Sequence, residues 1–283
     1  MKPVIVRTID ELRERVRGLR KQGHTVGLVP TMGALHAGHL SLVQAAKADG
    51  HKVIVSIFVN PTQFNDPKDL DKYPRDEAAD VALLAPLGVD IVWAPDVDEM
   101  YADGFSTTVS VSGVSEGLCG ATRPGHFDGV ATVVTKLLLQ AQADAAYFGQ
   151  KDFQQLAVIN RFVTDLNIPV EIVGCPILRE DDGLAMSSRN VRLSETGRKT
   201  APALFLALSK AAEDIESGND VTRVLAHASK SLLEAGFTSI DYLELRASDN
   251  LSPMAQFDRP ARLFAAAFLG DVRLIDNVVV KGR

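Results

Sequence analysis

Several features that mark membrane, secreted or zinc-binding proteins are missing from this sequence of 283 residues. No run approaches the roughly 20 consecutive apolar residues that cross a bilayer, so we expect no membrane partner. Only two cysteines are present, Cys119 and Cys175, and they form no Cys-x-x-Cys pair. We therefore expect two free thiols. The first ten residues include Lys2, Arg7 and Asp10, too much charge for a secretion signal, and we expect a cytoplasmic location.

Basic residues are also in the minority. The chain has 30 Lys and Arg against 36 Asp and Glu, a formal net charge of −6. A protein that binds nucleic acid through its phosphates usually has the opposite balance, so we expect no nucleic-acid partner. Hydrophobic residues make up 46% and charged residues 23%, which is typical of a globular protein and excludes intrinsic disorder. The length suggests about two domains.

Predicted strands and helices alternate through the first part of the chain. The capping-box residues Thr8 and Glu11 predict a helix that ends at Gly23. Apolar runs predict strands at 25–30, 53–59, 91–94, 145–148 and 170–173, and helices are predicted at 40–48, 75–84, 127–142 and 154–166. The first two apolar runs are continuous, as in parallel strands covered on both faces. This pattern predicts an α/β domain over residues 1–176 with a mostly parallel, doubly wound sheet.

A different pattern follows. Helices are predicted at 195–215 and 221–235, and strands at 239–245, 261–269 and 272–280. The turn Gly270-Asp271 makes the last two strands a hairpin. Residues 177–283 are therefore predicted to form a smaller α+β domain with antiparallel strands.

The loop between the first core strand and the next helix contains two glycines and two histidines. Gly33 and Gly38 allow the backbone to approach a ligand closely. His36 and His39 project to one side of the first helical turn, where free N–H groups and the helix dipole favour anions. Two histidines alone would need further ligands to hold zinc, and two ordinary surface histidines are the other alternative. Contact with phosphates is the interpretation we favour.

Two later segments have the residue types of phosphate-binding loops. In Gly149-Gln150-Lys151-Asp152, between a predicted strand and helix, Lys151 is a mobile point charge suited to phosphate. Asp152 either caps the helix or holds ribose hydroxyls, and a solvated turn is the alternative. Met186-Ser187-Ser188-Arg189-Asn190 combines hydroxyl and guanidinium donors that can follow charge as it moves onto pyrophosphate. The alternative there is a loop that only caps the next helix.

These motifs also carry a resemblance. His36-Ala37-Gly38-His39 resembles the His-x-Gly-His signature of nucleotidyltransferases and class I aminoacyl-tRNA synthetases. The segments 58–64, 73–75, 123–130, 149–156 and 186–190 occur in the same order and spacing as in the pantothenate synthetase family, to which nearly the whole chain is similar. That family joins pantoate to β-alanine at the expense of ATP, and it gives pantothenate, AMP and pyrophosphate through a pantoyl-adenylate.

The resemblance implies a Rossmann-like nucleotidyltransferase domain over 1–176, a C-terminal lid domain over 177–283, and a homodimer. It implies catalytic roles for His36, His39 and Lys151. Gln63 and Gln155 are implied to contact pantoate, and Gln63 also β-alanine, with Asn60, Arg123, His126 and Asp128 as candidate neighbours. The implied ATP-binding residues are Met32, Gly33, Ala34, Leu35, His36, Ala37, Gly38, His39, Gly149, Gln150, Lys151, Asp152, Leu178, Met186, Ser187, Ser188 and Arg189.

ATP chemistry of this kind needs Mg²⁺, which we expect to be held mainly by phosphates and water. Acidic residues gather at Asp66, Asp69, Asp71, Asp76, Glu77 and Asp80, most simply as a solvated face. Asp80 matches a metal-associated position of the family, but Ala79 and Leu83 beside it are not ligand types, so no protein ligand is predicted. The alternatives to this function are another nucleotidyltransferase or adenylate-forming enzyme of the same superfamily, an RNA binder, or an inactive nucleotide sensor.

Overall fold

The computed structural model describes residues 2–65, 70–71 and 73–282, so Asp66 and Asp69 of the acidic group lie outside the described residues. The chain folds into two compact units. The first unit contains residues 1–115, 123–150 and 155–176, and the second contains 116–122, 151–154 and 177–283. The expected domain over 1–176 is therefore interrupted by two short segments that belong to the second unit.

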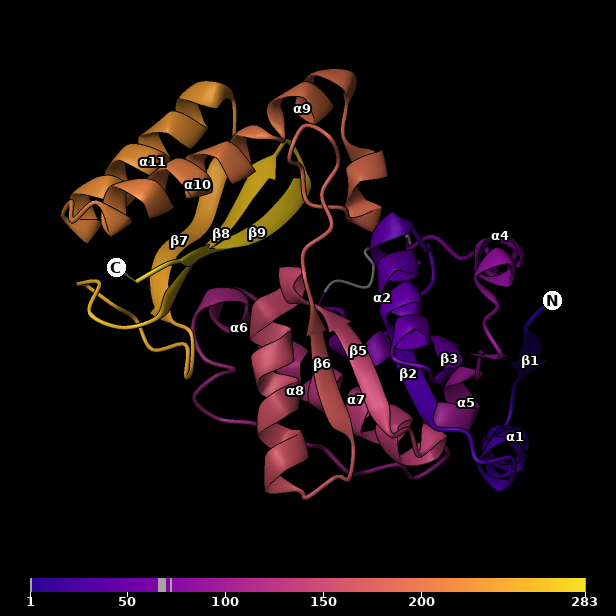
Figure 1. Ribbon diagram of the computed structural model, residues 1–283. Helices are drawn as coiled ribbons and strands as arrows, with labels where there is room; N and C mark the ends of the chain where they lie inside the picture. Colours follow the sequence, from indigo (N-terminus) through magenta and orange to yellow (C-terminus); the bar gives the residue numbers. More distant parts are fainter. Residues whose placement is uncertain (1, 66–69, 72, 283) are drawn as a thin grey trace. The chain divides into compact units, whose positions relative to one another are not determined.

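A six-stranded parallel sheet, in the order β1-β4-β3-β2-β5-β6, forms the centre of the first unit (Figure 1). Its strands are β1 (Val4–Val6), β2 (Val26–Thr31), β3 (Lys52–Ile57), β4 (Ile91–Trp93), β5 (Ala145–Gly149) and β6 (Glu171–Cys175). The order reverses between β2 and β5, so the loops that leave the carboxyl ends of these two strands start side by side. Open α/β sheets bind their ligands at such a switch point.

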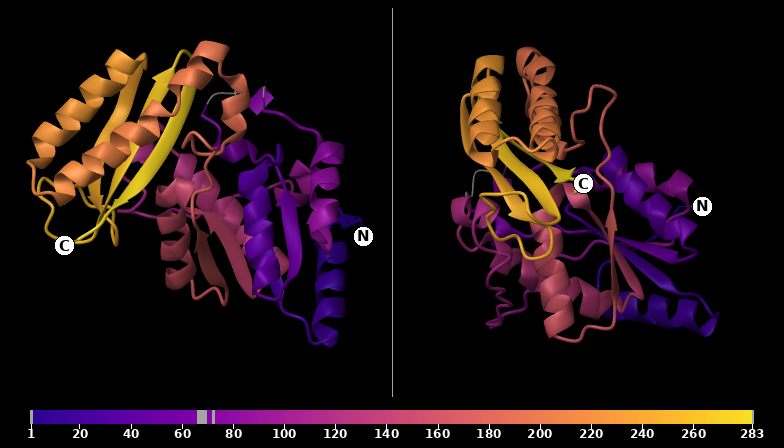
Figure 2. Two further views of the ribbon diagram at one scale, coloured as in Figure 1. Left: turned by 45° about the horizontal axis from the view of Figure 1, so that its top comes forward. Right: turned by 60° about the vertical axis from the view of Figure 1, so that its left-hand side comes forward.

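Helices cover both faces of this sheet (Figure 2). Helices α2 (Ala37–Ala48) and α4 (Glu77–Leu84) contribute to the core on one face, and α1 (Ile9–Lys21) and α7 (His126–Ala141) pack together against β2 on the other. Shorter elements and the last helix of the unit are η1 (Pro61–Gln63), η2 (Ala85–Leu87), α5 (Val97–Met100), η3 (Gln150–Asp152) and α8 (Phe153–Asp165). The predicted capping box of α1 is present, with Thr8 as N-cap and Glu11 as its partner.

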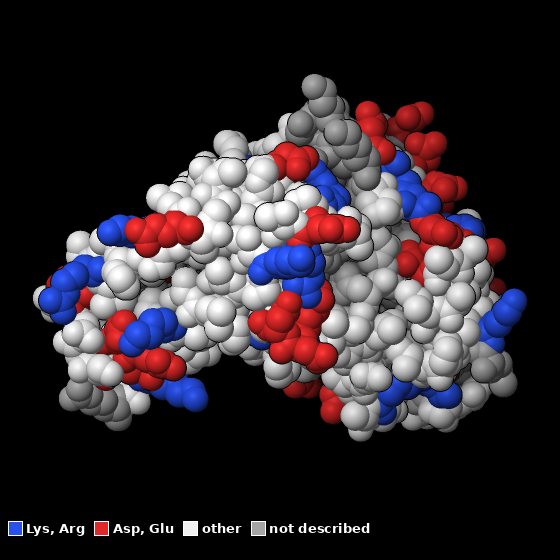
Figure 3. Space-filling model, turned by 90° about the horizontal axis from the view of Figure 1, so that it is seen from above, with Lys and Arg blue, Asp and Glu red and all other residues white. Residues whose placement is uncertain are grey.

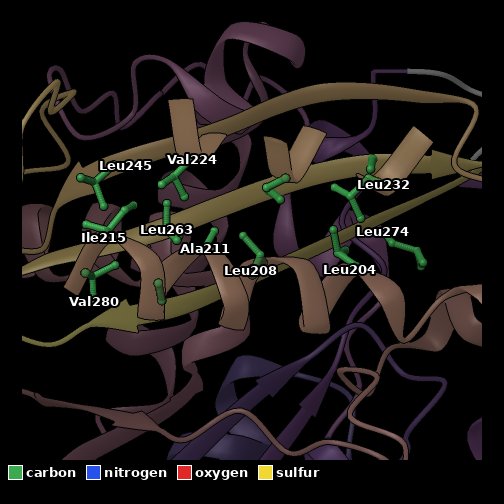
Figure 4. Packing of buried hydrophobic residues seen from close by; sticks show 14 of the residues in the cluster. Leu204, Leu208, Ala211, Ile215, Val224, Leu232, Leu245, Leu263, Leu274 and Val280 are labelled. Carbon is green, nitrogen blue, oxygen red and sulfur yellow. The ribbon is translucent and has the colours of Figure 1, made fainter. Parts of the chain in front are cut away.

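The second unit has an antiparallel sheet in the order β7-β8-β9, formed by β7 (Ser239–Ala247), β8 (Ala261–Leu269) and β9 (Val272–Val280). Helices α10 (Ala203–Glu216) and α11 (Val221–Ala235) pack on one face of this sheet. Figure 4 shows the apolar contact, in which Leu204, Leu208 and Ile215 of α10 meet Leu263 of β8 and Leu274 of β9. Its remaining elements are α6 (Leu118–Thr122), η4 (Ser188–Arg192) and α9 (Glu195–Thr200).

The two short segments of the second unit pack on the face of its sheet that α10 and α11 leave open. Cys119 Sγ lies 3.1 Å from Tyr242 Oη on β7, and the ring centroids of Phe153 and Phe264, on β8, lie 5.9 Å apart. The segments also bond to each other, because Gln154 Oε1 accepts the backbone N–H of Cys119 at 3.0 Å. Lys151 is thereby tied to the C-terminal part of the chain.

The fold class predicted from the sequence is confirmed: a parallel α/β sheet followed by a smaller antiparallel α+β unit. One predicted element is wrong, since the expected helix over 195–215 is divided into α9 and α10. Pro202 lies between them, and proline has no backbone N–H with which to continue a helix. The short edge strand β1 was not predicted. Cys119 and Cys175 are both buried free thiols, as expected.

Charges of both signs are mixed on the surface. Figure 3 shows Lys and Arg interspersed with Asp and Glu on the face that it displays. Arg198, for example, pairs with Glu180 and Asp182. Among the described residues, no helix combines the length and the apolar character needed to cross a membrane.

Candidate active site

The loop that follows β2 has a conformation that requires glycine. Gly33 has φ +78, and a Cβ atom on this residue would lie 2.9 Å from Oδ2 of Asp80. The backbone N–H of Gly33 donates to Thr31 Oγ1 at 3.2 Å. The loop therefore turns sharply at the end of the strand, and its Gly33–Leu35 backbone lies against Asp80 of α4.

Asp80 on α4 holds this loop. Its Oδ2 accepts the N–H of Ala34 at 3.0 Å and its Oδ1 accepts the N–H of Leu35 at 2.7 Å. The side chain is only 4% exposed, and burial raises the pKa of this carboxyl although the two hydrogen bonds lower it. Both carboxylate oxygens thus serve the backbone of the loop. Sequence reasoning associated Asp80 with a metal and missed this role; the signal was its position four residues before Leu84, on the buried face of α4.

His36 and His39 cap the helix that the loop leads into. His36 is the N-cap of α2, with Nδ1 accepting the N–H of Gly38 at 3.1 Å. His39 Nδ1 accepts the N–H of His36 at 3.4 Å, and the two rings are 4.1 Å apart. Because each Nδ1 is an acceptor, the proton of each neutral ring is assigned to Nε2. The two imidazoles are therefore oriented as Nε2–H donors, the tautomer that suits an anionic ligand.

A second polar group surrounds Gln63. Asn60, only 1% exposed, donates from Nδ2 to Gln63 Oε1 at 3.1 Å, and Gln63 Nε2 lies 3.0 Å from Sδ of Met32. The backbone carbonyl of Gln63 accepts from Arg123 at 3.1 Å and from Nδ1 of His126 at 2.9 Å. The structure thus brings the predicted substrate residue Gln63 next to the glycine loop. Asn60, Arg123 and His126 fix its position.

The second unit contains a pocket that is lined by three of the residues predicted to bind phosphate. Lys151, Ser187 and Arg189 all line it, and the Lys151 side chain is 16% exposed. Lys151 Nζ lies 3.8 Å from a carboxylate oxygen of Asp152, whose side chain is half-exposed. The other lining residues are Leu184, Ala185, Asn190, Leu204, Phe205, Arg273, Leu274, Ile275 and Asp276. Three cationic residues (Lys151, Arg189 and Arg273), the serine Ser187 and one acidic residue (Asp276) therefore line the same pocket.

The loop that carries Ser187 and Arg189 is shaped by hydrogen bonds at its base. Met186 donates its N–H to the carbonyl of Leu178 at 3.0 Å, which closes the two sides of the loop. Ser187 is the N-cap of η4, and its Oγ accepts the N–H of Arg189 at 3.3 Å. Ser188 begins η4. Ser187 thus caps η4 within the motif and also lines the pocket, whereas the next helix, α9, is capped by Ser194.

The remaining predicted residues are placed as follows. Ala37 begins α2, Gly149 ends β5, and Gln150 donates to the carbonyl of Gly174 at 3.1 Å. Gln155 lies half-buried in the first turn of α8, and Leu178 is 39% exposed. The hydrogen bonds described above do not connect Gln155 with Gln63. His126 and Asp128 occupy the first turn of α7.

No group of three or more His, Cys, Asp and Glu within the described ranges is arranged to hold a metal ion. Asp80 is a poor candidate because its two oxygens each already accept a backbone N–H. The part of the chain that the structure describes therefore offers no cluster of three such side chains for a divalent cation.

A Rossmann-like sheet, a glycine and histidine loop at its switch point, and a Lys-Ser-Arg pocket define a nucleotide-using enzyme. The family model of pantoate–β-alanine ligases matches residues 4–279. A pantothenate synthetase of Chelativorans sp. is 60% identical over 276 residues, which cover 98% of this chain and 97% of the relative. One from Cereibacter sphaeroides is 59% identical, covering 98% of this chain and all of the relative.

Solved structures agree. The crystal structure of pantothenate synthetase from Thermus thermophilus has a TM-score of 0.92 at 46% identity, covering 98% of this chain and 99% of that one. The pantoate–β-alanine ligase of Francisella tularensis, complexed with β,γ-ATP and β-alanine, has a TM-score of 0.82 at 35% identity, covering 98% and 97%. The chain belongs to the pantoate–β-alanine ligase family and is an enzyme of that class. The resemblance inferred from the motifs is confirmed.

Proposed function

We propose that this enzyme condenses pantoate with β-alanine to pantothenate at the expense of ATP, through a pantoyl-adenylate, with release of AMP and pyrophosphate. The observation that carries the proposal is the family match over residues 4–279, in a chain whose motif residues Lys151, Ser187 and Arg189 line one pocket. The ATP and β-alanine bound by the Francisella tularensis relative support the same substrates.

In the first half-reaction, a carboxylate oxygen of pantoate attacks the α-phosphorus of ATP and the bond to the β,γ-pyrophosphate breaks. Negative charge then grows on the leaving group. Lys151, Arg189 and the hydroxyls of Ser187 and Ser188 have the donors that stabilise this charge. The carboxylate itself is the nucleophile, so the reaction needs no covalent enzyme intermediate.

In the second half-reaction, the neutral amine of β-alanine attacks the acyl carbon and displaces AMP, and the amine loses a proton. His39 is the proposed group for donation to the phosphate or for proton transfer, because an imidazole titrates near the working pH. The assigned Nε2–H of His36 and His39 places a donor on each ring. Their Nδ1 atoms remain with the helix N-terminus.

We assign pantoate to Gln63 and Gln155, and β-alanine also to Gln63. A neutral amide can bind hydroxyl and carboxylate groups without neutralising the nucleophilic oxygen. The contacts of Gln63 support this assignment: Asn60 holds the side-chain oxygen, and Arg123 and His126 hold the backbone carbonyl, so the residue loses little entropy when it binds. The loop residues 32–39, with Gly149, Gln150, Asp152, Leu178 and Met186, are assigned to ATP.

Mg²⁺ is the metal we propose, held mainly by the phosphates and by water, where it would neutralise part of their charge. The engagement of both Asp80 oxygens with the loop backbone supports this arrangement. We also propose that the enzyme is a homodimer, on the basis of its family. We propose a cytoplasmic location on the basis of the two free thiols. Light scattering coupled to size exclusion tests the dimer, and a mass equal to one chain contradicts it.

Oxygen transfer tests the route. With ¹⁸O in the carboxylate of pantoate, the adenylate mechanism places one labelled oxygen in AMP, because the acyl–oxygen bond breaks in the second step. Label in inorganic phosphate would indicate an acyl phosphate and would refute the mechanism. Absence of AMP formation with pantoate, β-alanine and ATP would refute the function itself.

A further inference from the structure

A buried asparagine on β9 is bonded to the main chain of the lysine turn. Asn277 Nδ2 donates to the carbonyl oxygen of Lys151 at 2.9 Å, and Asn277 is 2% exposed. Its neighbours along this face of β9 are Ile275 and Val279, in a strand that is otherwise largely apolar. A buried amide lowers stability unless its hydrogen bonds are satisfied, so packing alone would favour an apolar residue here.

Arg262 fixes the orientation of that amide. Its Nη1 donates to Oδ1 of Asn277 from the adjacent strand β8. Arginine has only donors and a carbonyl oxygen only accepts, so Oδ1 must face Arg262 and Nδ2 must face Lys151. The Asn277 side chain therefore has a single arrangement between its two partners.

The same arginine is also packed against the segment that it helps to hold. The Arg262 guanidinium lies 4.0 Å from the ring of Phe153, two residues after Lys151. Its Nε has no hydrogen-bond partner among the described residues, and burial lowers the pKa of Arg262 to about 10. A buried charge in this position is costly for folding, which points to a purpose other than stability.

Asp276, the residue before Asn277, is hydrogen-bonded to the base of the loop that contains Ser187. Asp276 accepts two hydrogen bonds from Arg179, at 2.6 and 2.9 Å, and Arg179 forms the β-bridge with Ala185 just before the Ser187 loop. Asp276 also accepts the backbone N–H of Asn277 at 2.7 Å. Two adjacent residues of β9 thus contact the base of the loop and the lysine turn.

We propose that Asn277, oriented by Arg262, is a positioning residue. By holding the main chain of Lys151, it fixes where the Lys151 side chain lies in the pocket, so that the ammonium group can stabilise the charge on the departing pyrophosphate. This inference rests on the proposed function, because it takes Lys151 to be a phosphate ligand. Asn277 touches the main chain of Lys151 and not the reacting atoms. Its effect must therefore be transmitted through Lys151.

The sharpest variant is Asn277→Asp. A carboxylate keeps the size and the bond to Arg262 but replaces the donor facing the Lys151 carbonyl with an acceptor, which repels it. We expect single-turnover adenylate formation to slow by about 10- to 100-fold, the size expected for misplacing a charged group by about 1 Å. Pantothenate formation from preformed pantoyl-adenylate should stay within about twofold, because pyrophosphate has already left. Asn250→Asp, an exposed change in the same unit, is the matched control and should leave both rates unchanged.

A double-mutant cycle separates positioning from general damage. If Asn277 acts through Lys151, adding Asn277→Asp to Lys151→Ala slows adenylate formation no further. Additive losses, or equal losses in both half-reactions, would overturn the proposal. If Lys151→Ala leaves adenylate formation intact, the proposed function of Lys151 has failed. If Lys151→Ala slows adenylate formation but Asn277→Asp does not, the positioning role of Asn277 is refuted and the function of Lys151 stands. Asn277→Ala, which removes the donor without adding a charge, is the second variant if the aspartate does not fold, and it must show the same split.

Discussion

Replacing Asp80 should destabilise the protein even when no nucleotide or metal is present. Its carboxylate is the acceptor for the N–H groups of Ala34 and Leu35, at 3.0 and 2.7 Å. In Asp80→Ala both N–H groups lose their acceptor, at a cost of about 1–3 kcal/mol each. Removal of a buried charge offsets part of this cost, since burial raises the pKa of Asp80. We expect a net loss of about 2–4 kcal/mol from the free energy of unfolding.

Asp80→Asn keeps one acceptor oxygen but turns an NH₂ group toward the other N–H, so its loss should be smaller, about 1–2 kcal/mol. The measurement is urea unfolding followed by circular dichroism, in buffer with a chelator and without ATP. Asp103→Asn, an exposed change in the same unit, is the control for lost charge and should change stability by less than about 0.5 kcal/mol.

If Asp80 were a metal ligand without a structural role, its replacement would not lower the free energy of unfolding in the absence of metal. If Asp80→Ala were as stable as the parent protein, or more stable, without metal, the carboxylate would not be holding the loop and the reasoning would be refuted. The pH dependence gives a second check. Because the folded pKa of Asp80 is raised above its unfolded value of about 4, its contribution is largest below that value and declines as pH rises through the folded pKa. The stability gap between the parent and Asp80→Asn should therefore narrow from pH 4 to pH 7, and a gap that widens contradicts the assignment.

Three further changes test the proposed roles. Lys151→Ala should cost about 2–4 kcal/mol of transition-state stabilisation in adenylate formation, while preformed pantoyl-adenylate still reacts at nearly the parent rate; equal damage in single-turnover assays of both steps would contradict the division. His39→Ala should lower turnover about 10²- to 10³-fold with unchanged circular dichroism, and near-normal turnover at saturating substrate would rule out its role. Gln155→Ala should weaken apparent pantoate affinity by about 0.5–1.5 kcal/mol and leave ATP affinity unchanged; the reverse pattern would assign Gln155 to the nucleotide.

Features that depend on neighbouring residues could be predicted from the sequence. Thr8 and Glu11 are three positions apart, and their capping box forms as the pattern indicates. The Gly270-Asp271 turn connects β8 and β9 as expected, because a tight turn between two apolar runs leaves few other pairings. The parallel order of the first sheet follows from alternating elements in the same way, since each crossover brings the next strand back in the same direction.

Features that depend on contacts between residues far apart in the chain could not be predicted from the sequence. Asp80 lies 46 positions from Ala34, and its acidic surroundings indicated a solvated face rather than a bond to the loop backbone. Asn277 lies 126 positions from Lys151, and no local pattern connects them. The available signal was physical: a polar residue placed on a face where its i+4 or i±2 neighbours are apolar must find a partner in the interior. Such a rule identifies the buried polar residue, but its hydrogen-bond partner can be identified only from the three-dimensional structure.

Both unpredicted residues use the same physical device in different units of the chain. Each is a buried polar side chain that hydrogen-bonds the main chain of a loop with phosphate-binding residue types: Asp80 accepts from the Ala34 and Leu35 N–H groups, and Asn277 donates to the Lys151 carbonyl. A bond to the main chain fixes the path of a loop and leaves its side chains available for ligand. Substitution of the loop's own Ala34 by another small residue would preserve both bonds, whereas Asp80→Ala removes both acceptors. The identity of the loop residues is therefore less restricted at these points than the identity of the distant residue that holds them.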